Sequence, residues 1–127
     1  MPPDDRSDIH DPARLPRKPD LEPEAFRALD LRVGRILEVR PFPKARRPAW
    51  QLAVDFGPLV GVLSTSAQVT KHNEEELVGR LVVGVINLGS KRIAGFKSEF
   101  LVLGALDRDG TVRLLEVPAV DPGAPVA

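Results

Sequence analysis

The sequence contains no cysteine, few aromatic residues and no long hydrophobic run. The lack of cysteine excludes disulfides, thiolate metal ligands and a cysteine nucleophile. Five phenylalanines and one tryptophan are the only aromatic residues, so we expect a mainly aliphatic core. No apolar run approaches the roughly 20 residues of a membrane helix, and the N-terminus lacks the basic and apolar regions of a signal peptide. We therefore expect a soluble, cytoplasmic protein without membrane insertion.

The chain has 127 residues and no net charge, but its charges are unevenly distributed. Its length is that of one domain with a sizeable core. Residues 25–49 hold seven basic residues against two acidic ones, whereas the segments on either side are acidic. The net charge therefore argues neither for nor against nucleic acid, and a local basic patch is compatible with it.

The N-terminal part of the chain differs in composition from the rest. Residues 1–22 are rich in proline and charge and hold little apolar surface, which predicts a flexible tail followed by one domain over residues 23–127. A short helix is predicted over residues 23–29, because a proline suits its first turn and Phe26 and Leu29 share a face. A helix this short is unstable alone, so we expect it to dock.

Alternating apolar and polar residues predict a series of short strands. In residues 31–40 the alternation places Leu37 on the apolar face with Val39, and Ile36 on the opposite face. The same alternation puts Arg32 and Arg40 on one side of this strand. Further strands are predicted over residues 50–56, 59–63, 81–86, 99–105 and 111–117, with a proline-rich loop at 41–48 and a turn at 107–110. Five or six strands with hardly any helix predict an all-β fold, a small closed barrel.

Motifs for catalysis or cofactor binding are absent from the sequence. There is no phosphate-binding glycine loop and no serine-nucleophile elbow. His72 precedes three glutamates, but the pattern favours a helix start, with Asn73 and Glu76 as a capping box and Gly79 as the end. We expect no enzyme activity, no metal and no cofactor.

Residues 87–104 have a composition of their own. They join two predicted buried strands through three basic residues, three glycines and several short polar side chains. Lysine and arginine beside short polar side chains suit contacts with phosphate. A solvated connection between strands fits the same composition, so the residues alone leave both interpretations open.

Three motifs follow one another along the chain: Asp30-Leu-Arg-Val-Gly-Arg-Ile36, Asn87, and Arg92-Ile-Ala-Gly-Phe-Lys-Ser98 followed by Leu-Val-Leu. Between and around them lie Phe42-Pro43, Arg46, Pro48-Ala49, Asp55-Phe-Gly57, Ser66-Ala-Gln-Val-Thr70 and Lys91-Arg92. Over residues 25–118 the chain resembles the tRNA-binding OB-fold domain, which occurs free and appended to methionyl- and phenylalanyl-tRNA synthetases. Within that family it is similar to the CsaA type, which comprises export-related chaperones.

The resemblance implies a five-stranded Greek-key OB barrel and a homodimer. The short N-terminal helix and the strand and tail after Thr111 would pack against the partner copy. It also implies that Asn87, Arg92 and Ser98 contact tRNA, because they match the family's motif positions. Leu101 stands where the family commonly has methionine, a conservative departure.

Two functions follow from the resemblance. The first is a non-enzymatic, export-related chaperone that binds unfolded or pre-export polypeptides. The alternative is a structure-specific tRNA-binding protein, such as a tRNA chaperone or a synthetase accessory factor. The candidate tRNA-binding residues are Arg32, Arg46, Asn87, Lys91, Arg92, Lys97 and Ser98, with Arg40 and Arg47 as further candidate contacts. The candidate peptide-binding residues are Phe42, Pro43, Trp50 and Phe96, with Phe42 and Phe96 expected to be exposed in polar loops.

Overall fold

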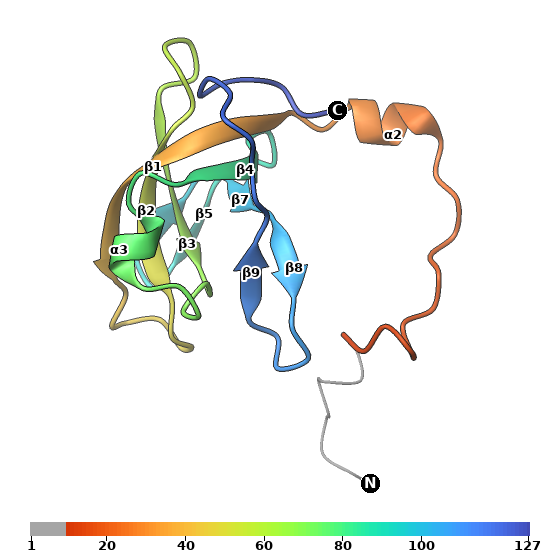
Figure 1. Cartoon of the computed structure of the whole chain (residues 1–127), viewed down its shortest axis with the longest axis horizontal. Coiled ribbons are helices and arrows are strands. Elements are labelled where there is room, and N and C mark those ends of the chain that lie inside the picture. The colour runs from red at the N-terminus through yellow and green to blue at the C-terminus, as the bar shows by residue number, and fades with distance from the viewer. Residues whose placement is uncertain (1–9) are drawn as a thin grey trace, which may run out of the picture.

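The computed structural model describes residues 10–127, which form a nearly closed antiparallel β-barrel (Figure 1). The elements are α2 (Pro23–Arg27), β1 (Leu31–Pro41), β2 (Trp50–Asp55), β3 (Val62–Ala67), α3 (Glu74–Leu77), β4 (Leu81–Val85), β5 (Lys91–Ile93), β6 (Phe96–Ser98), β7 (Leu101–Val102), β8 (Gly104–Leu106) and β9 (Val112–Leu114). Five strands form one sheet in the order β3-β2-β1-β4-β7, and β5–β6 and β8–β9 are separate hairpins. The Glu99 N–H donates to the Ser64 carbonyl over 2.7 Å, which links the two sheet edges. The predicted all-β, OB-like fold is confirmed.

A β-bulge divides β1 and overturns part of the predicted alternation. The register with β2 shifts between Ile36 and Glu38. Ile36 is fully buried and Leu37 is 45% exposed, the reverse of the prediction for these two residues. One extra residue in a strand moves all later side chains to the other face. The same shift separates Arg32 and Arg40, so the prediction that they share one side is wrong.

Two phenylalanines fill the centre of the barrel, and a glycine makes room for them. Phe56 and Phe100 meet edge to face with ring centroids 4.8 Å apart, and both are buried. A Cβ on Gly84 of β4 would lie 2.8 Å from Phe100 and 2.9 Å from Phe56. Strand β4 therefore approaches the rings closely only because this position has no side chain.

Gly84→Ala should destabilise the fold by about 1–3 kcal/mol, because a methyl group there overpacks the two rings. Urea unfolding followed by the fluorescence of Trp50 measures this change in the free energy of unfolding. An unchanged unfolding midpoint would contradict this prediction. It would show that the two rings can move aside for the methyl group without a loss of stability.

The predicted local signals around α3 and the β8–β9 turn are confirmed. Asn73 Oδ1 accepts from the Glu76 N–H over 2.8 Å, and the Glu76 carboxylate accepts in return from the Asn73 N–H. Gly79 follows with a φ of 84°. In the β8–β9 turn the Gly110 N–H donates to the Asp107 carbonyl. Over the part of the chain that is described, no helix is long and apolar enough to span a membrane.

The N-terminal segment runs outside the barrel in a wide arc from the β8–β9 turn to α2 (Figure 1). Residues 1–9 of the predicted tail lie outside the described residues. Arg108 in the β8–β9 turn pairs with Asp11 over 3.0 Å, which joins the start of the arc to the barrel. The short helix is present, but α2 buries none of its residues, so its expected docking does not occur within this chain.

The C-terminal segment lies on its own barrel. The Val126 N–H donates to the Leu31 carbonyl and the Val33 N–H donates to the Ala124 carbonyl, along the part of β1 that β2 leaves unpaired. Val117 and Val126 pack against the apolar cluster around Leu31. The expectation that this tail needs a partner surface is therefore wrong for these two valines, because β1 offers them one in the same chain.

Candidate nucleic-acid interface

The tight β5–β6 hairpin carries all three basic residues of the segment 87–104, which was predicted as a connection between strands. Ala94 and Gly95 both have positive φ angles, 49° and 84°, as the two central residues of a type I′ turn require. The Arg92 guanidinium donates to the Gly95 carbonyl over 3.1 Å and braces this turn. Alternation in the sequence does not reveal the hairpin, because its strands have only three residues each.

The hairpin holds like charges next to each other. Arg92 and Lys97 are directly opposite in the β5–β6 register, and both are exposed. Like charges at opposed positions destabilise a sheet. An anion bound at the hairpin would relieve this repulsion.

A tilted aromatic pair fixes the neighbouring loop, residues 42–49, against the hairpin. The ring centroids of Phe42 and Phe96 are 5.4 Å apart. Phe42 is 6% exposed, so the prediction of an exposed Phe42 is wrong. The polar residues around it in sequence hid its packing partner, which lies 54 positions further along the chain.

A groove runs along the outer edge of β3 between this loop and the hairpin. It consists of two adjoining cavities that share Ser66 and Ile93, with volumes of about 340 and 440 Å³. The first has Lys91 and Ser98 in its lining, and the second has residues of the loop. We call this the basic groove and define it by Lys44, Arg46, Arg47, Ser66, Gln68, Lys91, Ile93 and Ser98.

The cations of this region lack acidic partners. Elsewhere on the barrel, basic side chains such as Arg113 form ion pairs within their own hairpin, in this case with Asp107 over 2.7 Å. Around the groove none of the basic side chains pairs with an acid in residues 10–127, so their charge is available to a ligand. These side chains are Lys44, Arg46, Arg47, Lys91, Arg92 and Lys97.

One end of the groove region is acidic. Next to Arg47 and Gln68, a further cavity reaches Asp109. Hydrogen bonds from the Thr111 hydroxyl and N–H, with a smaller contribution from Lys71, hold the pKa of Asp109 at about 2, below its ordinary 3.8. Asp109 is therefore ionised at neutral pH, and the stability that it adds is lost only as the pH falls from about 4 towards 2. This carboxylate would repel a polyanion bound in the groove, so we expect the bound polyanion to end before it reaches Asp109.

Two of the candidate tRNA-binding residues have structural partners instead. The Arg32 guanidinium pairs with Asp30 over 2.6 Å and donates to the Gly123 carbonyl, so it ties the C-terminal segment to β1. The Asn87 amide accepts from the Asp30 N–H and donates to the Ala28 carbonyl, both over 2.8 Å, so it holds the chain that follows α2. Their geometry does not support a role in ligand binding.

The remaining candidate tRNA-binding residues lie in two places, the basic groove and the hairpin beside it. Arg46, Lys91 and Ser98 lie in the basic groove, and Arg92 and Lys97 lie on the hairpin beside it. Sequence reasoning left Lys44 and Gln68 out of the candidate set, although the run of bases in residues 25–49 was an available signal for Lys44. Arg47 was a candidate contact and lies in the basic groove.

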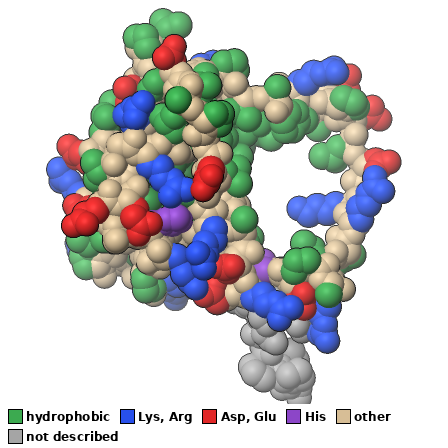
Figure 2. All heavy atoms as spheres, viewed as in Figure 1, with side chains coloured by type: hydrophobic (Ala, Val, Ile, Leu, Met, Phe, Trp, Pro, Cys, Tyr) green, Lys and Arg blue, Asp and Glu red, His purple; other side chains and the backbone are tan. Residues whose placement is uncertain are grey.

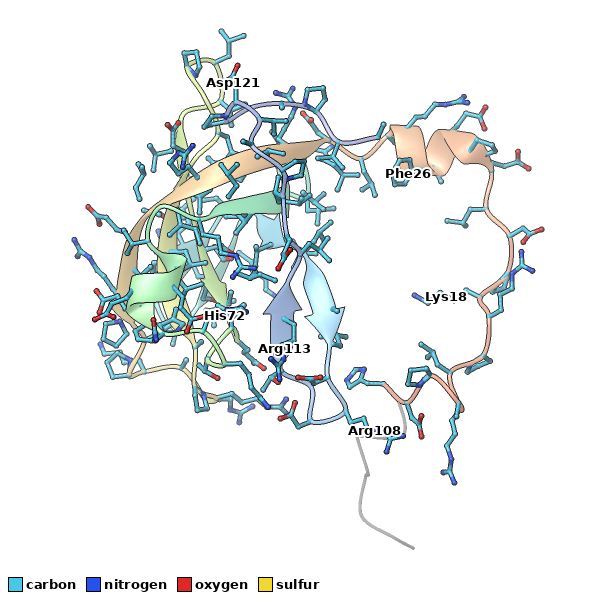
Figure 3. All side chains as sticks on the ribbon, viewed as in Figure 1. Lys18, Phe26, His72, Arg108, Arg113 and Asp121 are labelled. Atoms are coloured by element: carbon cyan, nitrogen blue, oxygen red, sulfur yellow. The ribbon has the colours of Figure 1, made fainter. Side chains whose placement is uncertain are left out.

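Three of the four candidate peptide-binding residues come together on the other side of the hairpin. Phe42, Pro43 and Phe96 are part of the lining of one open cavity of about 450 Å³. Trp50 is half-buried elsewhere, with its indole N–H donating to the His72 carbonyl over 3.2 Å. In Figure 3, His72 lies against the lower part of the barrel near Arg113.

Comparison with protein families gives one match that spans most of the barrel. The model described as "Putative tRNA binding domain" matches residues 31–125. The match includes all nine strands and α3, and it leaves out α2 and the arc that precedes it.

Two solved structures named as CsaA chaperones share the fold and a considerable part of the sequence. The protein from Picrophilus torridus is 40% identical, with a TM-score of 0.81 over 85% of this chain and 100% of its own. The protein from Bacillus anthracis is 41% identical, with a TM-score of 0.81 over 86% of this chain and 100% of its own.

Curated relatives with a similar sequence are much longer enzymes. A methionine–tRNA ligase from Protochlamydia amoebophila is 34% identical over 110 residues, which is 87% of this chain and 15% of that enzyme. A methionine–tRNA ligase from Thermotoga maritima is 36% identical over 104 residues, 80% of this chain and 16% of the enzyme. The chain thus spans about a sixth of the length of these relatives and matches them only as a fragment.

Proposed function

The chain belongs to the tRNA-binding domain family and is a CsaA-type member of it, and from this premise we propose that it binds folded tRNA through the basic groove. The observation that carries the proposal is the set of six cations along the β3 edge and the β5–β6 hairpin that pair with no acid within residues 10–127. Phosphate neutralisation by lysine and arginine supplies most of the affinity of such interfaces. We expect binding without catalysis, in the cytoplasm, where tRNA is found.

A second candidate function is the binding of unfolded or pre-export polypeptides. The names of the two CsaA chaperones favour it. In this chain the cavity beside Phe42, Pro43 and Phe96 offers apolar surface next to the groove. Because Phe42 is buried and packed, Phe42→Ala would disturb the fold and is a poor test of client binding. Pro43 is exposed and is the better position to vary.

We also propose a homodimer, with a second copy covering the apolar face of α2. Leu21, Phe26 and Leu29 are 78%, 51% and 39% exposed, although they gather around one short helix. Phe26 points from α2 into the space between the arc and the barrel (Figure 3). Figure 2 shows this space as an opening with hydrophobic side chains along its upper border. A five-residue helix that buries none of its residues in its own chain needs such a cover to persist.

Parallel titrations of tRNA and of a reduced, unfolded protein, each at two salt concentrations, test the proposed function. For tRNA we expect log K to fall with log[salt] with a slope of about −4 or steeper, because each neutralised phosphate contributes about −0.9. An unfolded polypeptide bound through apolar surface should give a much flatter line. Failure to bind tRNA at low salt would refute the first function, and failure to bind the polypeptide would refute the second.

A further inference from the structure

The inner cavity of the basic groove combines apolar walls with one lysine and a group of hydroxyls. It has a volume of about 340 Å³, and Leu88, Ile93 and Leu101 are among its lining residues. Leu88 and Leu101 are 56% and 51% exposed, so their side chains are accessible to a ligand. A cavity near the small end of ligand sites accommodates a single nucleotide unit rather than a folded helix. We call it the inner pocket and define it by Ser66, Leu88, Lys91, Ile93, Ser98 and Leu101.

Hydrogen bonding determines which groups the inner pocket can offer. Thr65 is 2% exposed, and its hydroxyl donates to the Phe100 carbonyl over 2.7 Å. A carbonyl only accepts, so this bond uses the single hydroxyl proton of Thr65. The Ser66 carbonyl is a weaker alternative at 3.4 Å.

The Thr65 proton determines the role of Ser98. The two hydroxyl oxygens are 3.1 Å apart, and Thr65 has no proton left for this contact. The Ser98 hydroxyl therefore donates to Thr65 and presents only its lone pairs to the pocket. Phosphate oxygens are acceptors, so Ser98 is unsuited to a contact with phosphate. It is suited to a ligand that donates an N–H.

We propose that the inner pocket takes one unstacked nucleobase that carries an exocyclic amino group, with the adjoining phosphate on Lys91. This inference rests on the proposed tRNA binding and names the part of the RNA that enters the groove. Apolar side chains such as Leu88 and Leu101 can enclose the faces of a base. The Ser98 oxygen accepts from the amino group, which cytosine, adenine and guanine have and uracil lacks. Lys91 supplies the positive charge beside it.

Short single-stranded RNAs test the pocket without the rest of a tRNA. Hexacytidylate and hexauridylate are both pyrimidine strands, and only cytosine has the exocyclic amino group, whereas uracil has an N3–H. Their comparison therefore separates recognition of the amino group from stacking. For the wild-type chain we expect hexacytidylate to bind about fivefold more tightly in fluorescence anisotropy, as one net hydrogen bond allows. Methyl NMR signals of Leu88 and Leu101 should shift on its addition.

Ser98→Ala is the decisive variant. It should weaken hexacytidylate binding until the two strands bind within about twofold of each other, while hexauridylate binding stays unchanged. The fold should survive, because Thr65 keeps its hydrogen bond to Phe100. Ser90→Ala, in the exposed loop before β5, is the matched control and should retain the preference. Lys91→Ala should weaken both strands equally.

Failure of this inference is distinguishable from failure of the proposed function. Equal binding of both strands by the wild type, or an equal loss of both in Ser98→Ala, would overturn the base pocket even if tRNA binds. Two NMR results would also contradict the base pocket. In the first, the methyl signals of Leu88 and Leu101 do not shift when RNA binds; in the second, they shift on addition of an unfolded polypeptide and not of RNA. A wild-type chain that binds no tRNA at all would refute the proposed function itself.

Discussion

Replacing Arg46, Arg47 and Lys91 together by alanine should weaken tRNA binding at low salt by about a hundredfold. Each contact with phosphate contributes about 1 kcal/mol, and three of them correspond to roughly two powers of ten. The slope of log K against log[salt] should become shallower by about 2.7, because three neutralised phosphates are lost. The three side chains line the basic groove and lack ion pairs within residues 10–127, so folding should be unaffected.

A triple variant with the same loss of charge provides the control. Arg17, Lys18 and Arg40 are exposed and lie outside the groove. Their replacement by alanine removes three positive charges but no proposed phosphate contact, so the salt slope should stay close to that of the wild type. Equal losses in both triple variants would mean that overall charge, and not the groove, is responsible for binding. Melting temperatures of both should match the wild type.

Phe26→Asp should convert the proposed homodimer into a monomer. A carboxylate at the centre of an apolar contact has no partner and loses its hydration, which destabilises the interface by several kcal/mol. Sedimentation should then show a species of the 13.9 kDa chain mass in place of one of twice that mass. The barrel should keep its stability, because Phe26 is 51% exposed and α2 buries nothing within the chain.

Two comparisons sharpen this test. Leu59→Asp introduces the same charge at a side chain that is 99% exposed in the β2–β3 turn, and it should leave the dimer intact. Deleting residues 1–22 removes Leu21 but should also preserve the dimer, because α2 remains and keeps Phe26 and Leu29. A wild-type chain that sediments as a monomer at micromolar concentration would contradict the proposal directly.

Local patterns in the sequence were sufficient for several elements of the barrel. The alternation of residues 50–56 predicted β2, and Leu52, Val54 and Phe56 are buried as expected. The capping box of α3 and the β8–β9 turn were also predicted. Each of these signals lies within a few residues of the element that it specifies, so no distant contact is needed to interpret it.

The bulge in β1 shows what such patterns miss. Leu37 and Ile36 are both large and apolar, and alternation alone cannot decide which of them faces the core. The answer depends on how β1 pairs with β2 on one part of its length and with β4 on the other. The pairing of the strands in the sheet, and not the local sequence, therefore decides whether Ile36 or Leu37 faces the core.

The candidate site likewise combines features that the sequence shows with features that only the structure shows. The bases of residues 25–49 and of the β5–β6 hairpin were visible in the sequence, and the structure brings both groups to the edge of β3. Arg32 and Asn87 match family positions, but their hydrogen bonds hold the C-terminal segment and the chain that follows α2. Phe42 was expected in solvent, yet it packs at a tilt against Phe96. These partners are far away in sequence, so composition gave no sign of them.

By itself the sequence determined the fold class, most strand positions, the family and the local excess of basic residues in 25–49, because these follow from local periodicity, ordered motifs and composition. Only the tertiary structure decided which cations lack an acidic partner within residues 10–127, which face each side chain of β1 takes, and that the Thr65 hydroxyl donates its proton to the Phe100 carbonyl. Each of these depends on a contact between distant segments, such as Thr65 with Phe100 across the closure of the barrel. Burial and hydrogen-bond polarity arise from such contacts, and they decide what a residue of a given type can bind.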